Sequence, residues 1–215
     1  MKTHIRHYQG YALLLLAQVM VGVCIVGSKA LLSTTPMMFI LTARFSIGFL
    51  FLLALHFIVS KTRLSSLRDL SRSTWVVIIV QALCAGAFFN LLLLLGMKFT
   101  SASMAGIITS ALPAIVVIAS IVFLKERLTR RAGLSIGLAI LGLIIINARN
   151  LHLEQSDHFL GDMIILLSLI PEAAYYILSK LHQNKLPVFL VSALMNGINV
   201  PVFCLILIFH QHPIS

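Results

Sequence analysis

The sequence predicts an all-α polytopic membrane protein, a bundle of about seven transmembrane helices. Of its 215 residues, 60% are hydrophobic and 10% are charged, whereas soluble domains have roughly 45–50% apolar and about 25% charged residues. Apolar runs of about 20 residues recur, and each is long enough to cross a hydrocarbon core about 30 Å thick. The runs do not alternate between apolar and polar residues, so the spans are expected to be helices and not strands of a closed barrel.

Seven apolar segments are expected to span the bilayer. The three cysteines lie inside these segments, and we interpret them as small apolar packing residues. The predicted spans are Tyr11 to Leu32, Met37 to Val59, Trp75 to Met97, Ser101 to Leu124, Ala132 to Asn147, Asp162 to Lys180 and Val188 to Phe209.

The positive charge lies between the apolar runs. A net charge of +10 could indicate a nucleic-acid partner, but such proteins carry their basic residues on a folded polar face. Loops on the cytoplasmic side are enriched in Lys and Arg, so the charge distribution predicts a cytoplasmic N-terminus. With that orientation only Lys98 and Arg149 fall in outer loops, and the inner side receives Lys2, Arg6, Lys61, Arg63, Arg68, Arg72, Lys125, Arg127, Arg130, Arg131, Lys180 and Lys185.

A weak internal repeat relates the start of the chain to its last third. Five spans separate the two copies, and an odd number inverts the second copy in the membrane, as in many transporters. We therefore predict a first five-helix repeat over residues 1–148 and the first two helices of an inverted second repeat over 149–215. By this period three further helices are expected, and the sequence is interpreted as incomplete. A shift of 151 residues aligns Gly10 with Gly161, Ser28-Lys29 with Ser179-Lys180, and Pro36 with Pro187.

The fourth and fifth spans carry a specific pattern of motifs. Ala111-Leu112-Pro113 lies within a helix rich in small residues, which ends in Phe123 to Thr129 and is followed by Gly133, Gly137 and Gly142. This pattern resembles the EamA family of the drug/metabolite transporter superfamily. The resemblance implies two inverted five-helix halves, a multi-pass location in the bacterial inner membrane and cytoplasmic termini. The sequence departs from that family because it lacks helices eight to ten.

Glu172 is the first candidate for the substrate-binding site. It lies about ten residues into the sixth span, which at 1.5 Å per residue places it roughly 15 Å deep. An acid at that depth costs about 2.5–3.5 kcal/mol on insertion scales and marks a functional site by default. We predict that Glu172 faces a central cavity and recognises a cation or couples transport to protons. The alternative is a protonated, hydrogen-bonded packing residue.

Four other polar side chains complete the predicted substrate site: Gln18, Asn90, Ser110 and Tyr175. Gln18 and Asn90 are amides within spans, where they can bind substrate or bond a neighbouring helix. Ser110 can line a cavity or bond the preceding helical turn. These alternatives remain open from the sequence.

Five residues are expected to have structural or gating roles. Pro113 and Pro171 remove helix hydrogen bonds and are expected to kink or open their helices. Glu126 is expected to pair with the basic residues beside it, and Gly133 and Gly137 form a small-xxx-small face for close helix packing. We expect no catalytic residue, metal site or cofactor.

The resemblance implies an exporter or exchanger of amino acids, related metabolites or drugs, working by alternating access. One alternative is an inactive fragment or a subunit that needs a partner chain. An intramembrane enzyme is less favoured because HExxH and clustered acidic metal motifs do not occur. The expected partners are a small-molecule substrate, the lipid bilayer and, as an option, a second copy of the chain in a homodimer; no nucleic acid is expected.

Overall fold

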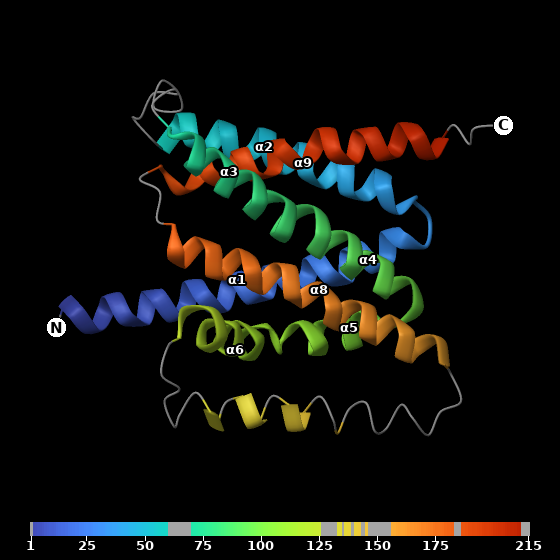
Figure 1. Cartoon of the computed structure of the whole chain (residues 1–215), viewed down its shortest axis with the longest axis horizontal. Coiled ribbons are helices and arrows are strands. Elements are labelled where there is room, and N and C mark those ends of the chain that lie inside the picture. Colours follow the sequence, from blue (N-terminus) through green and yellow to red (C-terminus); the bar gives the residue numbers. More distant parts are fainter. Residues whose placement is uncertain are drawn as a thin grey trace.

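A computed structural model describes residues 2–59, 70–125, 156–182 and 186–211, together with short pieces between 133 and 145. The chain folds into long helices, one of which contains a π-helical segment (Figure 1). The elements are α1 (Lys2–Leu32), α2 (Met37–Val59), α3 (Arg72–Gln81), η2 (Ala82–Phe88), α4 (Phe89–Phe99), α5 (Ala102–Thr109), α6 (Leu112–Leu124), α8 (Ser156–Leu181) and α9 (Val188–Gln211).

Within the described part of the chain, six helical stretches of 21 to 28 residues are long and apolar enough to cross a membrane. They coincide with six of the seven predicted spans, and a polytopic helical membrane bundle is confirmed. The fifth predicted span, Ala132–Asn147, is described only in short pieces, and these pieces are helical. The inverted repeat and its boundary between residues 148 and 149 stay predictions.

The helices run roughly side by side, so that the bundle has two ends (Figure 1). We call the end where α1 begins the N-terminal end; α3 and α9 also begin there, and α2 and α8 end there. The opposite end is the far end, where α1 and α4 end and α2, α5 and α8 begin.

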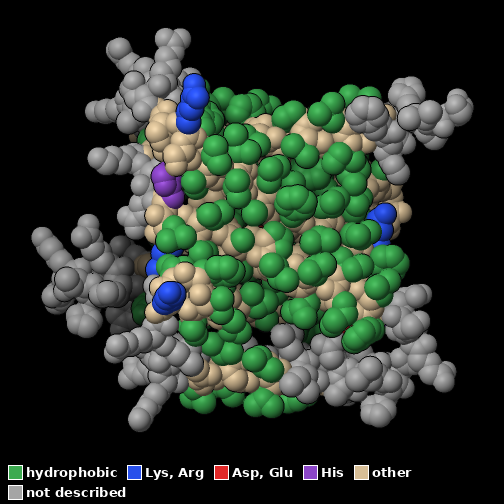
Figure 2. All heavy atoms as spheres, in the orientation of Figure 1, with side chains coloured by type: hydrophobic (Ala, Val, Ile, Leu, Met, Phe, Trp, Pro, Cys, Tyr) green, Lys and Arg blue, Asp and Glu red, His purple; other side chains and the backbone are tan. Residues whose placement is uncertain are grey.

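The surface of the bundle is apolar over its middle. Figure 2 shows one face on which hydrophobic side chains cover the centre, while Lys and Arg side chains lie toward its edges. Many large hydrophobic residues are exposed, among them Phe51, Ile58 and Phe123. In water such a surface would drive association, whereas in lipid it is the expected exterior.

Two antiparallel helix pairs hold the bundle together. α2 packs along α9, and Phe45 of α2 stacks on Phe203 of α9 with ring centroids 5.3 Å apart. α4 packs along α8, where Gly96 and Gly161 bring the two backbones together. Each of these pairs joins a helix of the first predicted repeat to a helix of the second.

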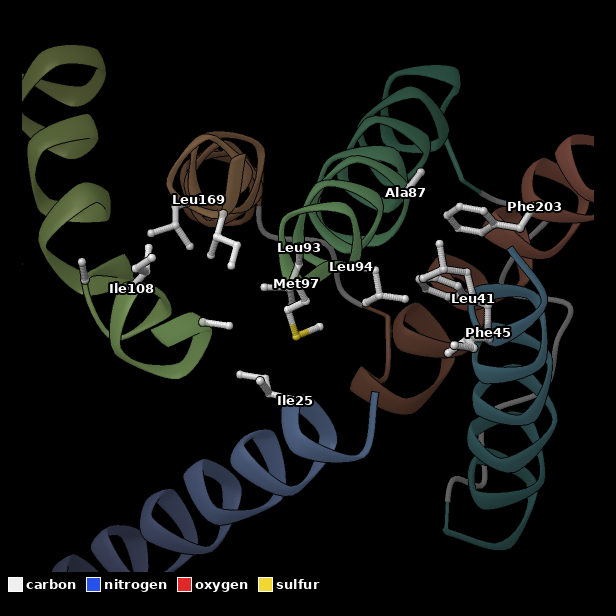
Figure 3. Close-up of a cluster of buried hydrophobic side chains, with 14 residues drawn as sticks. Ile25, Leu41, Phe45, Ala87, Leu93, Leu94, Met97, Ile108, Leu169 and Phe203 are labelled. Atoms are coloured by element: carbon white, nitrogen blue, oxygen red, sulfur yellow. The ribbon is translucent and has the colours of Figure 1, made fainter. Parts of the chain in front are cut away.

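The main hydrophobic core lies toward the far end of the bundle. Its buried side chains include Ile25 of α1, Leu41 of α2, Met97 of α4 and Ile108 of α5 (Figure 3). By contrast, every described side chain of α1 from Gly10 to Val23 is exposed. The described helices are therefore closely packed at the far end, where the last turns of α1 join them.

Candidate functional site

The third span contains a π-helical segment at its centre. Ten residues of α3 precede η2, and eleven residues of α4 follow it. A π-helix bonds residue i to i+5, so its turn is wider than an α-helical turn, and such turns occur often at functional sites. η2 contacts both α8 and α9.

Asn90 binds the widened turn from within its own span. It is 4% exposed, and its Nδ2 donates to the carbonyl oxygens of Ala85 at 2.9 Å and Gly86 at 2.8 Å. Because both carbonyls face the amide nitrogen, Asn90 Oδ1 points away from them, and this buried atom has no hydrogen-bond partner among the described residues. The side chain thus satisfies two π-helical carbonyls and leaves one acceptor open.

Asn199 binds the same turn from α9. Its side chain is fully buried, and Nδ2 donates to Ala82 O of η2 at 2.9 Å and to Met195 O of α9 at 2.8 Å. Its Oδ1 also has no partner within the described part of the chain. Gly86 makes room for this amide, since a Cβ built there would lie 1.9 Å from Asn199 Nδ2.

Glu172 lies beside η2 on α8. It precedes the end of its span at Leu181 by nine residues (181 − 172), or roughly 14 Å at 1.5 Å per residue. Its Oε2 is buried and lacks a hydrogen-bond partner in the regions that the structure covers. Cys84 of η2 and Tyr176 of α8 lie within electrostatic range of the carboxyl group.

Prolines interrupt the backbone hydrogen bonding of both helices that flank η2. Pro171 in α8 and Pro201 in α9 have no N–H, so the carbonyls four residues earlier, at Leu167 and Gly197, lose their usual donor. We call η2, Pro171–Glu172 of α8 and Asn199–Pro201 of α9 the mid-span layer. At membrane depth such irregular backbone is tolerated only where protein buries it or where it lines a polar cavity, and it is typical of transporter binding sites.

Residues 8–148, most of the chain, match the model of the EamA-like transporter family. The chain belongs to this family. It is also similar to a curated relative, the "Uncharacterized transporter YetK" of Bacillus subtilis (strain 168), with 27% identity over 188 residues. That match covers 86% of this chain and 56% of the relative, so the chain spans about half of the relative's length. No solved structure matches the chain.

The structure places the predicted substrate residues of this EamA-family chain in different environments. Asn90 and Glu172 both lie at η2, and Tyr175 is a half-buried neighbour whose ring meets that of Tyr176 edge-on at 5.1 Å. Gln18 is exposed on α1. Ser110 is exposed, and its Oγ donates to Ile107 O at 2.6 Å. The five residues thus do not form one cluster.

Pro113 interrupts the fourth span, as its sequence position predicts. α5 ends at Thr109, a turn follows at Ser110 and Ala111, and Pro113 lies in the first turn of α6. The N–H of Ala111 donates to Ile108 O at 3.0 Å, a tighter three-residue bond that closes α5 before the new helix begins. Pro171, in contrast, lies inside a continuous α8.

The predicted glycine face of the fifth span is not seen in close packing. A Cβ built on Gly137 would meet nothing within 4 Å in the described structure, and Gly137 is exposed. No described helix lies against that side of Gly137, and the close helix contact expected there stays a prediction. Gly133 is helical and half-buried. Glu126 and its proposed pairing with neighbouring basic residues lie outside the described residues.

Lys29 caps the end of another helix. Its Nζ donates to the carbonyl oxygen of Met97 near the end of α4, where the last carbonyls of a helix lack intrahelical donors. Lys29 is half-buried, and this bond joins α1 to α4.

Sequence reasoning missed two features of the site. The first is η2 itself, since nothing in its residues, Ala82–Phe88, separates a π-turn from an α-turn. The second is the pairing of Gly86 with Asn199 across 113 positions (199 − 86). The amides Asn90 and Asn199 in the middle of the third and seventh spans indicated a polar layer at this depth. The sequence does not show which carbonyl each amide binds, because that depends on how the helices are rotated. Among the described residues no group of three or more His, Cys, Asp or Glu side chains could hold a metal ion.

Proposed function

We propose that this chain forms a path for small metabolites across a bacterial inner membrane and acts as an exporter or exchanger by alternating access. Membership in the EamA-like transporter family supports the class of activity. The mid-span layer supports the location of the path, because three helices carry irregular backbone or buried polar groups at the same depth. The predicted orientation places the N-terminus in the cytoplasm.

An excess of hydrogen-bond acceptors characterises the proposed binding site, and this observation carries the proposal. Asn90 Oδ1, Asn199 Oδ1 and Glu172 Oε2 are buried acceptor atoms without a donor among the described residues. A substrate with N–H groups, such as the amino group of an amino acid or a small organic cation, supplies the missing donors. Tyr175 lies three residues after Glu172, on the same helix face, and is a further proposed contact.

Glu172 is the proposed ionisable group of the path. A carboxyl group within a span can bind a cation when ionised and can carry a proton when neutral, and transporters use acids at membrane depth in both ways. Competition between substrate and proton for this group would couple their movements in opposite directions. Gln18 and Ser110, which lie outside the mid-span layer, have no part in this proposal.

The test is transport by the purified chain in proteoliposomes. Accumulation of a radiolabelled amino acid or organic amine is measured with and without an imposed proton gradient. Glu172→Gln is expected to abolish saturable uptake, and Glu172→Asp to retain part of it. Ser110→Ala serves as the control, since its exposed hydroxyl bonds only its own helix. Uptake by Glu172→Gln at the rate of the unmodified chain would refute the role of Glu172.

A second candidate function is that of a subunit that works with a partner chain. The exposed side chains of α1 from Gly10 to Val23 favour this alternative, since no described helix covers them. If the partner is a second copy, the transport rate at low protein-to-lipid ratios should rise with the square of the protein density. A linear dependence would indicate a monomer, and absence of flux at every density would indicate a chain that is inactive alone.

A further inference from the structure

η2 gives the third span one residue more than a continuous α-helix of the same length would have. A π-helical turn closes its hydrogen bond over one residue more than an α-helical turn does. If the same turn closed as an α-helix, the residues of α4 would rotate relative to α3 by about one residue, or roughly 100°. The rotational setting of α4 therefore depends on the state of η2.

The far end of the bundle depends on that setting. Gly96 of α4 faces Gly161 of α8 in close backbone contact, and the carbonyl of Met97 accepts the bond from Lys29 of α1. Met97 is fully buried in the core cluster. A rotation of α4 by one residue would turn Gly96 away from Gly161 and remove both contacts together.

Asn199 holds the π-helical state from outside the span. Its amide donates to Ala82 O, a carbonyl at the start of η2, and lies against the Cα of Gly86. In hydrocarbon a carbonyl without a helical donor needs another donor. Asn90 supplies one for Ala85 and Gly86, but Asn90 rotates with α4. Asn199 belongs to α9 and can therefore transmit a movement of that helix.

We infer that Asn199 is a positioning residue that holds the third span in its π-helical register. Withdrawal of its side chain from Gly86 lets η2 close into an α-helix, which rotates α4 and opens the far end of the bundle. The inference goes beyond the proposed transport function and rests on it only for the statement that this opening is a step in transport.

The first experiment removes the extra residue of the π-helical turn. Deletion of Ala85 should give a continuous α-helix in which α3 and α4 keep their present orientations, so the chain should fold with the far end closed but without transport. Deletion of Leu52 in α2, a continuous α-helix, is the matched control and should prevent folding. Transport by the Ala85 deletion variant, or its failure to fold, would overturn the inference.

The second experiment measures the distance between α4 and α8 at the far end. Spin labels are placed on Lys98, near the end of α4, and on Phe159, near the start of α8, which are both exposed. Cys24, Cys84 and Cys204 are first replaced by alanine. Double electron–electron resonance should show a single distance in the otherwise unmodified chain and a second, longer population in Asn199→Ala. Asn196→Ala is the matched control, because that amide donates to Ser192 O of its own helix and faces Gly48 of α2.

Gly86→Ala displaces the Asn199 side chain without substituting Asn199 itself. Its Cβ would occupy the position of Asn199 Nδ2, so it should produce the same second population, and the double variant should add nothing further. An unchanged distance in Asn199→Ala or additive effects would overturn the inference. The distances are measured without substrate, so they test the role of Asn199 even if the chain shows no transport. Absence of transport would contradict the proposed function alone.

Discussion

Gly96 of α4 and Gly161 of α8 lie in direct backbone contact. A Cβ on Gly96 would lie 2.7 Å from Gly161 O, and a Cβ on Gly161 would lie 2.8 Å from Gly96 O. Helices in lipid associate through packing and not through a hydrophobic driving force, so glycines at a crossing allow the closest approach. This crossing fixes the spacing of the two helices at the far end.

Gly96→Ala should destabilise the protein. Its Cβ would also meet Ile165 Cγ1 at 2.5 Å, so α4 and α8 would have to separate, and overpacking of this kind costs about 1–3 kcal/mol. The measurement is the unfolding free energy in detergent followed by circular dichroism. Gly106→Ala in α5 is the control, because a Cβ there would meet nothing within 4 Å. Equal stabilities of the two variants would show that the crossing is not tight.

Asn90→Leu should lower stability by about 0.6–2 kcal/mol, the range measured for hydrogen bonds between polar groups in membrane proteins. The substitution removes the donor of the bonds to Ala85 O and Gly86 O while it keeps a side chain of similar size. Ser110→Ala, which removes one exposed intrahelical bond, should change stability by less than about 0.5 kcal/mol. Thermal unfolding of both variants in the same detergent tests this, and a Ser110→Ala effect as large as that of Asn90→Leu would contradict it.

Lys29→Met should loosen the attachment of α1 to the bundle. Methionine keeps most of the apolar stem but removes the ammonium group that binds Met97 O, and a cation at a helix C-terminus contributes about 0.3–1 kcal/mol. The expected readout is greater mobility of a spin label on α1 together with lower stability. Lys98→Met removes an exposed charge from the same end of α4. The interpretation would be wrong if Lys98→Met had the larger effect on α1.

The membrane orientation can be tested with reporter fusions. Alkaline phosphatase, which is active only outside the cytoplasm, should be inactive when fused after Leu70 and active when fused after Thr100. The physical reason is the excess of Lys and Arg on the side that contains residue 70. The opposite pattern of activity would invert the proposed topology.

The lengths and positions of the spans could be predicted from the sequence because the thickness of the hydrocarbon core sets them. The predicted span Met37 to Val59 coincides with α2, and the span predicted to begin at Trp75 begins at Arg72 in the structure. Hydropathy sums over many residues, so a few uncertain positions at the ends do not matter. The polar residues at mid-span, Asn90 and Glu172, could be recognised for the same reason, since depth follows from residue number.

The rotations of the helices could not be predicted in the same way. In lipid an apolar side chain suits the exterior as well as the interior, so α2 carries no polar stripe that would identify the face it turns to α9. The contact between Gly86 and Asn199 needs the rotation of both spans and the π-helical turn. Gln18 shows the same limit, because its depth matches a central site while its exposed position on α1 excludes it from the described cluster.

The pairing of α2 with α9 has a consequence for synthesis of the protein. The ribosome must add 128 residues (188 − 59 − 1) after the end of α2 before α9 begins, which takes roughly 6–26 seconds at about 5–20 residues per second. During that interval the side chains of Leu41, Phe45 and His56, which are buried in the folded structure, can contact only lipid or helices that are made before α9. Insertion of α2 into the membrane and its pairing with α9 are therefore separate events.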